Sequence, residues 1–523
     1  MIGKTLNIST SIFKKKLPDK VFLILIIAIH IILSISNCEL WIDEASSLIA
    51  ARMPFIQTLH QAITFEAQAP LYYLLLHIWL WPLKSIFYAR IFSLIFSMAS
   101  IPIVYKILKS LGLNSIMTLF LTLIFATNPF IIFSSCTIRY YSLSIFLSAL
   151  LFLLFNKIYV NNHLVLRARI LFITLSLVAV YVQYYLAFLL LTFGISLISI
   201  RKPRMFFSYV IDMIVPVIGT IILIMYIPTQ IDTYTLYIKV DSGILKGISF
   251  LLHRFENYFV NLTNVYDNKM TQNIFRILLF TLIIIIIWKY KIYKYFVERN
   301  WKTLLTINIL LVTIFFILYQ IFGSDLLFPW HTLTMFIPAF ILISMILCIR
   351  PNLPGILILV FFLWNNFTLI YKGMNKPVIR EYSLSSEYIT RHEKQHQPVF
   401  LFRNELELIY RFYYHGMNKL CPLPSKIDFD RGYNHLLWIP RDKNQIDSAF
   451  NAEIDENTRN FWLITQVSKT KIYNLNYHPE ILENYLRLNY TLLRDTIIGD
   501  IKVRFYKIPF ISDSNLSKRN PTN

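Results

Sequence analysis

Residues 21–51 read VFLILIIAIHIILSISNCELWIDEASSLIAA, and they decide how the chain is organised. The first part, 21–37, is almost wholly apolar and follows the basic residues Lys14, Lys15, Lys16 and Lys20. A membrane-spanning helix needs about 20 apolar residues. No cleavage site of small residues follows, so we interpret this run as an uncleaved signal anchor that leads directly into WIDEA at 41–45.

Apolar runs of the same kind recur up to about residue 372. They fall near 88–108, 115–133, 142–156, 170–182, 184–200, 205–227, 273–288, 303–320, 331–349 and 353–372. The region 170–200 is too long for one helix, and we divide it at 182–185. The composition agrees, because 56% of the 523 residues are hydrophobic and only 15% are charged, against about 25% charged in soluble domains. The sequence predicts a polytopic α-helical membrane protein with about eleven spans.

The net charge of +21 would suggest a nucleic-acid partner on a soluble chain. On a membrane chain, an excess of Lys and Arg in short loops marks the cytoplasmic side instead. With a cytoplasmic N-terminus, the inner segments hold Lys106, Lys109, Lys157, Arg167, Arg169, Arg201, Lys202, Arg204, Lys289, Lys291, Lys294, Arg299, Lys302 and Arg350. The outer loops hold Glu39, Asp43, Glu44, Glu66, Asp232, Asp241, Glu256, Asp267 and Asp325. We therefore expect no nucleic-acid partner, a cytoplasmic N-terminus and an outer C-terminus.

The composition changes near residue 377, after the last apolar run. Segments 398–403, 435–440, 460–467 and 501–508 have the pattern of strands, and 385–395 and 478–488 that of amphipathic helices. We expect a membrane domain over 1–376, a soluble α/β domain on the outer side over 377–510, and a polar tail over 511–523.

The first outer loop, 38–87, is much longer than a helix connection requires. Residues 38–64 predict an amphipathic helix that lies on the membrane, and 65–83 predict a second, aromatic-rich interfacial element. Aromatic rings prefer the headgroup level, which suits Trp41, Tyr72, Tyr73, Trp79 and Trp81. The same loop holds three carboxylates, Asp43, Glu44 and Glu66.

Two interpretations of the adjacent acids Asp43 and Glu44 compete. At the start of a helix, an acid caps free N–H groups and complements the helix dipole. Beside apolar and aromatic residues at the membrane surface, however, a partly desolvated carboxylate has a raised pKa, which suits a general base. The sequence also contains no Gly-rich phosphate loop, so it does not support a nucleotide-sugar site.

The loop resembles that of a known family. WIDEASSLIAA (41–51) followed by EAQAPLYYLLLHIWL (66–80) is similar to the first outer loop of C-type (GT-C) membrane glycosyltransferases. The bacterial branch with lipid A aminoarabinose transferases and protein O-mannosyltransferases is the most similar. Asp43 and Glu44 match its acidic pair, and Glu66 matches its later acid. Arg90 in YARIFSLIFS (88–97) and Arg139-Tyr140 in NPFIIFSSCTIRYYSL (128–143) match further family positions.

The resemblance implies an inverting transfer of a sugar from a polyprenyl-phosphate donor to an acceptor at the outer face of the bacterial inner membrane. Membrane lipids and an envelope acceptor, which is a lipid, glycan or protein, would be its partners. It implies Asp43 as general base, with Glu44 and Glu66 orienting the acceptor. Arg139, Arg90 and Tyr140 become candidates for binding the lipid phosphate. Tyr72, Gln183 and His331 are candidate contacts for donor or acceptor.

Three departures from the family pattern leave alternatives open. Thr137 replaces a frequent acid, Val182-Gln183-Tyr184-Tyr185 replaces Thr-His-Tyr-Tyr, and Pro329-Trp330-His331 replaces Pro-Arg-Tyr. Because a metal or phosphate ligand is thereby lost, metal dependence is open, with Asp43 and Glu66 as candidate ligands of a divalent ion. A metal-independent glycan ligase or polymerase is one alternative. A transporter or flippase is another, although almost no acid except Asp212 falls within a predicted span. A binding or assembly protein is a third, for which so many spans are excessive.

Overall fold

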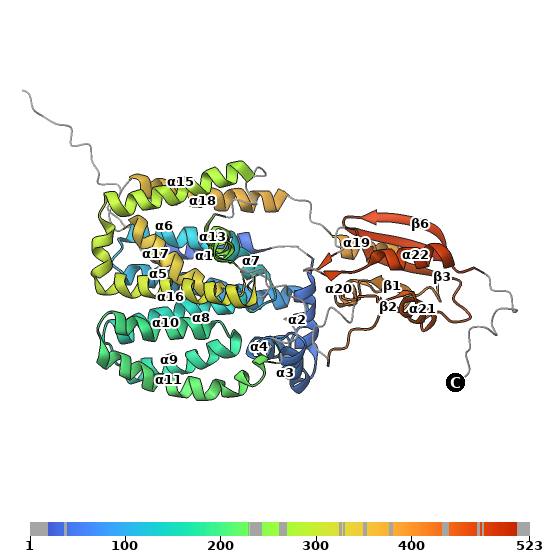
Figure 1. The fold of residues 1–523 in the computed structure, drawn as a ribbon, viewed down its shortest axis with the longest axis horizontal. Coiled ribbons are helices and arrows are strands. Elements are labelled where there is room, and N and C mark those ends of the chain that lie inside the picture. The colour runs from blue at the N-terminus through green and yellow to red at the C-terminus, as the bar shows by residue number, and fades with distance from the viewer. Residues whose placement is uncertain are drawn as a thin grey trace, which may run out of the picture.

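A helical bundle and a smaller sheet domain make up the molecule (Figure 1). The computed structural model describes residues 19–35, 39–228, 230, 243–260, 269–323, 327, 330–348, 353–375, 380–430, 439–467, 471–472 and 475–509. The bundle extends to α18 and the sheet domain begins at α19, so the predicted change near residue 377 falls between these two helices.

Six helices of the described chain are long and apolar enough to cross a membrane. They are α5 (Ile86–Ser110), α8 (Tyr141–Phe155) continued by η2 (Asn156–Val160), α11 (Pro203–Ile224), α15 (Lys269–Lys289), α16 (Arg299–Phe322) and α18 (Leu353–Asn375). Helices α6 (Ser115–Ala126) and α7 (Pro129–Cys136) form a seventh span if the pair is taken together. The predicted polytopic helical class is confirmed, whereas the count of about eleven is not.

Four shorter helices, of 13 to 17 residues, lie beside these spans in the bundle (Figure 1). They are α1 (Asp19–Ser34), α9 (Leu166–Val182), α10 (Leu186–Ser199) and α17 (Phe336–Cys348), the last preceded by η4 (Leu333–Met335). The chain does break at 183–185, as we predicted. Helix α13 (Ile244–Phe259) and η3 (Ile292–Val297) complete the described bundle.

The run predicted as one span over 115–133 is bent by 52°. Asn128 accepts a hydrogen bond from the N–H of Phe130 (2.9 Å) and so starts a new helix, with Pro129 in its first turn. Proline lacks an N–H and disfavours the helical conformation of the residue before it, which explains the break.

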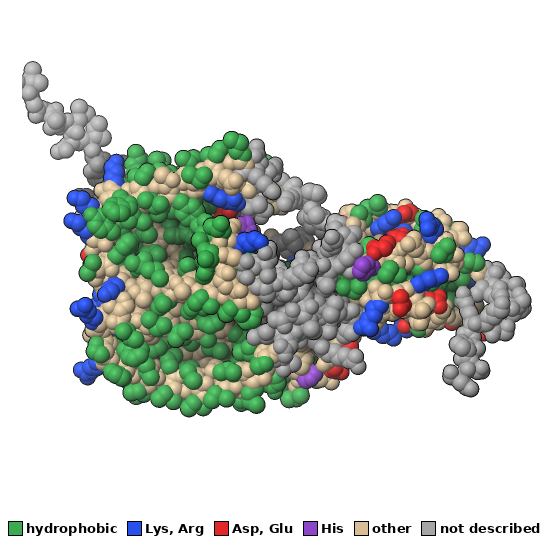
Figure 2. Space-filling view, in the orientation of Figure 1, with side chains coloured by type: hydrophobic (Ala, Val, Ile, Leu, Met, Phe, Trp, Pro, Cys, Tyr) green, Lys and Arg blue, Asp and Glu red, His purple; other side chains and the backbone are tan. Residues whose placement is uncertain are grey.

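Basic side chains gather at the end of the bundle that faces away from the sheet domain (Figure 2). Helix α5 starts next to the first loop, and its 25 residues extend about 37 Å. Lys106 and Lys109 therefore lie at the opposite end from that loop. The predicted separation of basic and acidic loops agrees with this arrangement, and which end faces the cytoplasm stays a prediction.

The first loop forms three helices, α2 (Ile42–Arg52), α3 (Phe55–Thr64) and α4 (Leu71–Trp79). The single helix predicted over 38–64 is wrong, because Pro54 ends α2. Helix α2 crosses the end of the bundle at a steep angle to the bundle axis (Figure 1). Tyr72 and Tyr73 are fully buried inside the protein, at 1% and 0% exposure, and their predicted depth at the headgroup level stays a prediction. They fill the space between this loop and the bundle.

The sheet has the strand order β2-β1-β3-β7-β6. Strand β1 (Val399–Phe402) pairs in parallel with β2 (Leu420–Leu423) and with β3 (Asn460–Gln466). Strand β7 (Ile501–Lys507) pairs antiparallel with β3 and with β6 (Thr491–Ile498). A separate short pair consists of β4 (Lys471–Ile472) and β5 (Leu475–Asn476).

Helices cover both faces of this sheet. Helices α19 (Glu381–His392) and α20 (Leu406–Tyr413) pack on one face, and α21 (Lys443–Asn451) and α22 (Pro479–Asn489) on the other. The predicted strands at 398–403, 460–467 and 501–508 and both predicted helices are observed. The strand predicted at 435–440 lies mainly outside the described residues.

The first loop holds the two parts of the molecule together. The Glu39 carboxylate accepts hydrogen bonds from the N–H groups of Tyr382 (2.9 Å) and Ser383 (2.7 Å) at the start of α19. The N–H of Leu40 donates to the Tyr413 hydroxyl of α20 (2.8 Å). Ala45 and Phe65 belong to the same apolar core as one face of the sheet. The acids of α2 therefore lie between the bundle and the sheet domain.

Candidate active site

Glu44 forms the first of two buried ion pairs in the loop. Its carboxylate accepts hydrogen bonds from Arg90 Nη2 (3.2 Å to Oε2) and from the N–H of Ile138 (2.9 Å), and its side chain is 3% exposed. The N–H of Trp41 donates to the same carboxylate (3.4 Å), as in a helix cap. Burial raises the pKa of the Glu44 carboxyl, while Arg90 acts in the opposite direction. The capping interpretation therefore holds for Glu44, and Arg90 ties it to the start of α5.

Glu66 and Arg139 form the second buried pair. Arg139 Nη1 donates to Glu66 Oε2 (2.8 Å) and to Ser47 Oγ (2.8 Å). The Tyr73 hydroxyl also donates to Glu66 Oε2 (2.8 Å), and Ser46 Oγ donates to Oε1. Both carboxylate oxygens of Glu66 are thus engaged by side chains of α2 and α4 and by Arg139.

Asp43 differs from both of these acids, because its side chain is only half-buried. Its backbone carbonyl accepts from Ser47 Oγ (2.9 Å) and from Arg139 Nη1 (3.3 Å), which holds the first turn of α2 against Arg139. Its carboxylate is close enough to Arg139 and Tyr141 to affect both electrostatically. Of the three loop carboxylates, Asp43 is the one with access to solvent.

Aromatic side chains surround this cluster on two sides. The ring of Tyr72 contacts Tyr140 (centroids 6.4 Å apart), and the Arg139 guanidinium lies over Tyr140 (5.7 Å). Tyr72 and Tyr140 thus lie within the cluster, and their proposed contacts with a substrate stay predictions. On the other side, Trp330 contacts Trp41 (5.9 Å) and Tyr141 (6.0 Å).

Gln183 and His331 lie one layer further away. Gln183 Nε2 donates to the carbonyl of Trp330 (3.0 Å), and His331 stacks on Tyr185 with centroids 5.7 Å apart. The described structure therefore brings Asp43, Glu44, Glu66, Arg90 and Arg139 together with Tyr72 and Tyr140. Gln183 and His331 reach this group through Trp330.

A divalent metal does not fit the loop acids as they lie here. No group of three or more His, Cys, Asp or Glu side chains suited to a metal occurs among the described residues. Glu66 is fully engaged by Ser46, Tyr73 and Arg139. A second cation beside Arg139 would also be repelled. The reaction proposed below therefore uses protein side chains alone.

Sequence reasoning missed Ser46, Ser47 and Tyr141. Ser46 and Ser47 lie three and four positions after Asp43, so a helix starting at Ile42 places all three on one face. That spacing could have identified the two serines. Nothing in the sequence indicated that Tyr141 would lie near Asp43.

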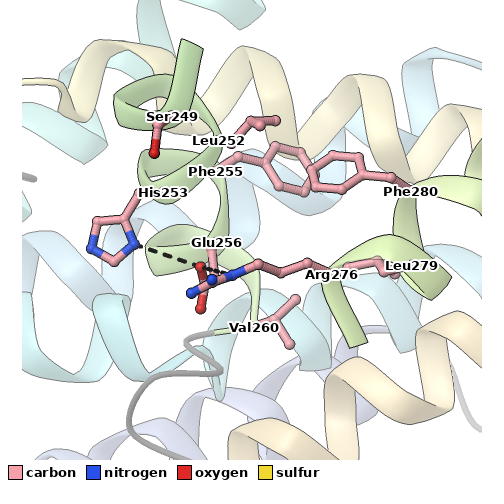
Figure 3. Close-up of a pocket in the computed structure, with 9 residues that line it drawn as sticks. All are labelled: Ser249, Leu252, His253, Phe255, Glu256, Val260, Arg276, Leu279 and Phe280. Atoms are coloured by element: carbon pink, nitrogen blue, oxygen red, sulfur yellow. Dashed lines mark hydrogen bonds and ion pairs between the residues drawn. The ribbon is translucent and has the colours of Figure 1, made fainter. Parts of the chain in front are cut away.

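A separate pocket of about 270 Å³ lies between α13 and α15 (Figure 3). Its polar wall is Glu256, whose Oε2 accepts from Arg276 Nε (2.7 Å) and lies 3.5 Å from His253 Nδ1. The apolar wall contains Phe255 and Phe280. None of these residues was among the predicted site residues.

Two solved structures are similar to this chain over nearly its whole length. ArnT from Cupriavidus metallidurans in the apo state has a TM-score of 0.59 and 10% sequence identity, and the match covers 93% of this chain and 98% of ArnT. The same protein bound to undecaprenyl phosphate has a TM-score of 0.56, with the same identity and coverage. The chain has the ArnT fold. No protein-family profile and no curated protein matches the sequence.

The ArnT fold agrees with the resemblance found in the first loop. ArnT is a lipid A aminoarabinose transferase of the GT-C class, which is the branch that the motifs around Asp43 and Glu66 resemble. At 10% identity the likeness concerns the fold.

Proposed function

We propose that this multi-pass membrane protein is a glycosyltransferase of the bacterial inner membrane. It moves a sugar from a polyprenyl-phosphate donor to an acceptor at the outer face. The ArnT fold carries this proposal, because a solved ArnT structure with that fold holds undecaprenyl phosphate. The polar cluster between bundle and sheet domain supports it further, since it lies where a membrane donor and a water-side acceptor would meet.

Asp43 is the general base in this proposal. A base must be able to reach the acceptor, and Asp43 is half-buried, whereas Glu44 and Glu66 are enclosed and paired with arginines. The base takes the proton of the acceptor hydroxyl or amine as that atom attacks the anomeric carbon. Direct attack breaks the bond to the lipid phosphate and inverts the anomeric centre. General base catalysis typically contributes about 10²–10⁴-fold.

Arg139 holds the lipid phosphate, with Arg90 and Tyr140 in support. A guanidinium offers several N–H donors in a fixed plane, which suits phosphate oxygens. Arg139 Nη1 is used by Glu66 and Ser47, while Arg139 Nε is buried with no hydrogen-bond partner among the described residues. The pairing with Glu66 fixes the orientation of Arg139 before the donor arrives. Glu44 fixes Arg90 in the same way.

The transporter alternative lacks support from the bundle interior. Asp212, the acid within a predicted span, accepts from Arg169 Nε (2.9 Å) and Nη2 (2.6 Å) and from the Tyr159 hydroxyl. A carboxylate bound in this way ties three helical segments together. This structural role explains why Asp212 is buried in the bundle, and no ion pathway is needed to explain it.

The decisive experiment is an assay of Asp43→Asn in proteoliposomes. The purified protein is given undecaprenyl-phosphate-linked sugars, together with envelope lipids and glycans from a strain that lacks it. We expect release of undecaprenyl phosphate by the wild type and a loss of at least about 100-fold in the variant. Asp447→Asn, at a half-buried position of α21 in the sheet domain, is the matched control. Undecaprenyl phosphate should still bind to Asp43→Asn, and full transfer by this variant would refute the assignment.

A further inference from the structure

The sheet domain has a pocket of its own at the carboxyl ends of its central parallel strands. The pocket has a volume of about 220 Å³ and lies at the ends of β1 and β3, where Phe402, Arg403, Thr465 and Gln466 line it. Lys502 of β7 and Glu483 of α22 complete its polar wall. It belongs to a different part of the fold from the cluster around Asp43.

The topology of the sheet makes this a favoured place for a ligand. From β1 the chain continues to β2 on one side, and it returns as β3 on the other side of β1. Helix α20 follows the carboxyl end of β1 and covers one face, whereas α22 follows the carboxyl end of β3, after β4 and β5, and covers the other. The connections therefore diverge between the carboxyl ends of β1 and β3. Open α/β sheets bind ligands in the crevice at such a switch point.

Arg403 gives the pocket a buried charged wall. Its side chain is 2% exposed and forms an ion pair with Glu405, which is also buried. Arg403 Nη1 donates to Gln466 Oε1 (3.1 Å), and the guanidinium lies 4.3 Å from the centre of the Tyr477 ring. Apolar replacements of a buried ion pair are often as stable, so stability alone does not account for it. Arg403 Nε has no hydrogen-bond partner within the described ranges.

The charges around the pocket are balanced. Arg403 is paired with Glu405, Lys502 with Asp495 (3.2 Å), and Arg504 with Glu483 (2.6 Å). An anion would have to compete with a carboxylate for each of these cations, so a neutral ligand fits better. The wall offers both donors and acceptors, including the hydroxyl of Thr465 and the amide of Gln466. The volume lies below the roughly 300–1,000 Å³ of pockets for drug-sized ligands.

We propose that this pocket binds a single uncharged sugar ring, whose hydroxyl groups both donate and accept hydrogen bonds. Binding in the pocket stands independently of the transfer reaction. The natural source of the sugar rests on the proposed function: it would be the glycan part of the acceptor, held by the sheet domain. Because Glu39 and Tyr413 attach this domain to α2, an acceptor bound here stays attached to the part of the molecule that carries Asp43.

Saturation-transfer difference NMR on the full-length protein in lipid nanodiscs tests the proposal. The probes are the methyl glycosides of glucose, galactose, mannose and N-acetylglucosamine. Inorganic phosphate is the comparison, and its binding is followed by phosphorus NMR line broadening because it has no carbon-bound protons. We expect binding of at least one glycoside, weakened about tenfold in the variant that combines Lys502→Gln with Thr465→Val. Lys502 is partly exposed, and Thr465 lies next to the end of β3, so the double variant should keep the fold. Circular dichroism checks this.

Lys507→Gln is the matched control, since Lys507 is exposed at the other end of the same strand β7. It should bind the glycoside like the wild type. The proposal is overturned if no glycoside binds, if the double variant binds as tightly as the wild type, or if phosphate binds in place of every sugar. None of these measurements involves sugar transfer. If the pocket does not bind a sugar, the proposed glycosyltransferase function is still decided by the transfer assay alone.

Discussion

Arg139 Nη1 lies 2.8 Å from Glu66 Oε2, and the two side chains are only 7% and 5% exposed. The pair joins two parts of the chain that are far apart in the sequence. Glu66 belongs to the first loop, and Arg139 lies in the short segment between α7 and α8. Since Arg139 also contacts Ser47 and the carbonyl of Asp43, one guanidinium fixes the helix that carries the proposed base.

Removal of the Glu66 charge should destabilise the protein strongly. Glu66→Gln leaves Arg139 buried without its counter-ion, and breaking a buried pair costs about 3–5 kcal/mol. The thermal unfolding midpoint of the purified protein in detergent measures the effect. Glu387→Gln breaks the exposed pair with Arg391 and should cost less than about 1 kcal/mol. Equal midpoints for the two variants would contradict the importance of the buried pair.

Arg139→Lys should weaken the binding of the lipid phosphate strongly and lower the stability of the folded protein only a little. The ammonium keeps the positive charge beside Glu66 but cannot present several donors in one plane. We expect the KM for the undecaprenyl-phosphate donor to rise about tenfold or more, from the loss of a charge-assisted hydrogen bond. A titration of undecaprenyl phosphate against variant and wild type measures this directly. Unchanged affinity would remove Arg139 from the phosphate site.

The cap that Glu39 provides for α19 should govern how firmly the sheet domain is attached. Glu39→Ala removes both acceptors from the N–H groups of Tyr382 and Ser383, and such a cap contributes about 0.5–2 kcal/mol. Hydrogen exchange at the start of α19 should accelerate, and sugar transfer should fall with it. Asp442→Ala is the control, because Asp442 caps α21 inside the sheet domain through the N–H of Gln445 (2.9 Å). That variant should affect exchange in α21 alone.

The stability of the bundle around α13 and α15 should depend on pH through Glu256. Burial would raise the pKa of its carboxyl, but His253 and Arg276 outweigh this effect and lower the pKa to about 2. A lowered folded-state pKa gives stability that is complete above the ordinary value of 4.5 and is lost as the pH falls towards 2. The wild type should therefore lose thermal stability between pH 4.5 and 2 more steeply than Glu256→Gln. Glu456→Gln, an exposed acid, should follow the wild type.

Much of the fold was predictable because it depends on local pattern. The apolar runs, the break at 183–185 and the strands β1, β3 and β7 all follow from hydrophobicity over short windows. Strand β6 was missed because most of its residues are exposed, so no buried alternation marks it. Helices α6 and α7 were merged because hydrophobicity does not register the bend that Asn128 and Pro129 produce.

The charged residues that the structure brings together in the loop could be named from the sequence, but their pairing could not. The motif identified Glu44, Glu66, Arg90 and Arg139, but the ion pairs join residues 46 and 73 positions apart. Such partners depend on how α5 and α7 pack against the loop, which a single sequence does not reveal. The full burial of Tyr72 and Tyr73 was not predictable for the same reason, since their surroundings come from distant segments.

Ala45 and Phe65 contribute side chains to the core of the sheet domain, although the sequence places them more than 300 residues before it. The two parts therefore share a core across the link before α19 and are not independent folding units. If the chain were cut there, the sheet domain would lose part of its apolar core. The other fragment would expose Ala45 and Phe65 to solvent. A sheet domain produced on its own would need the segment from α2 to Phe65 to complete its core.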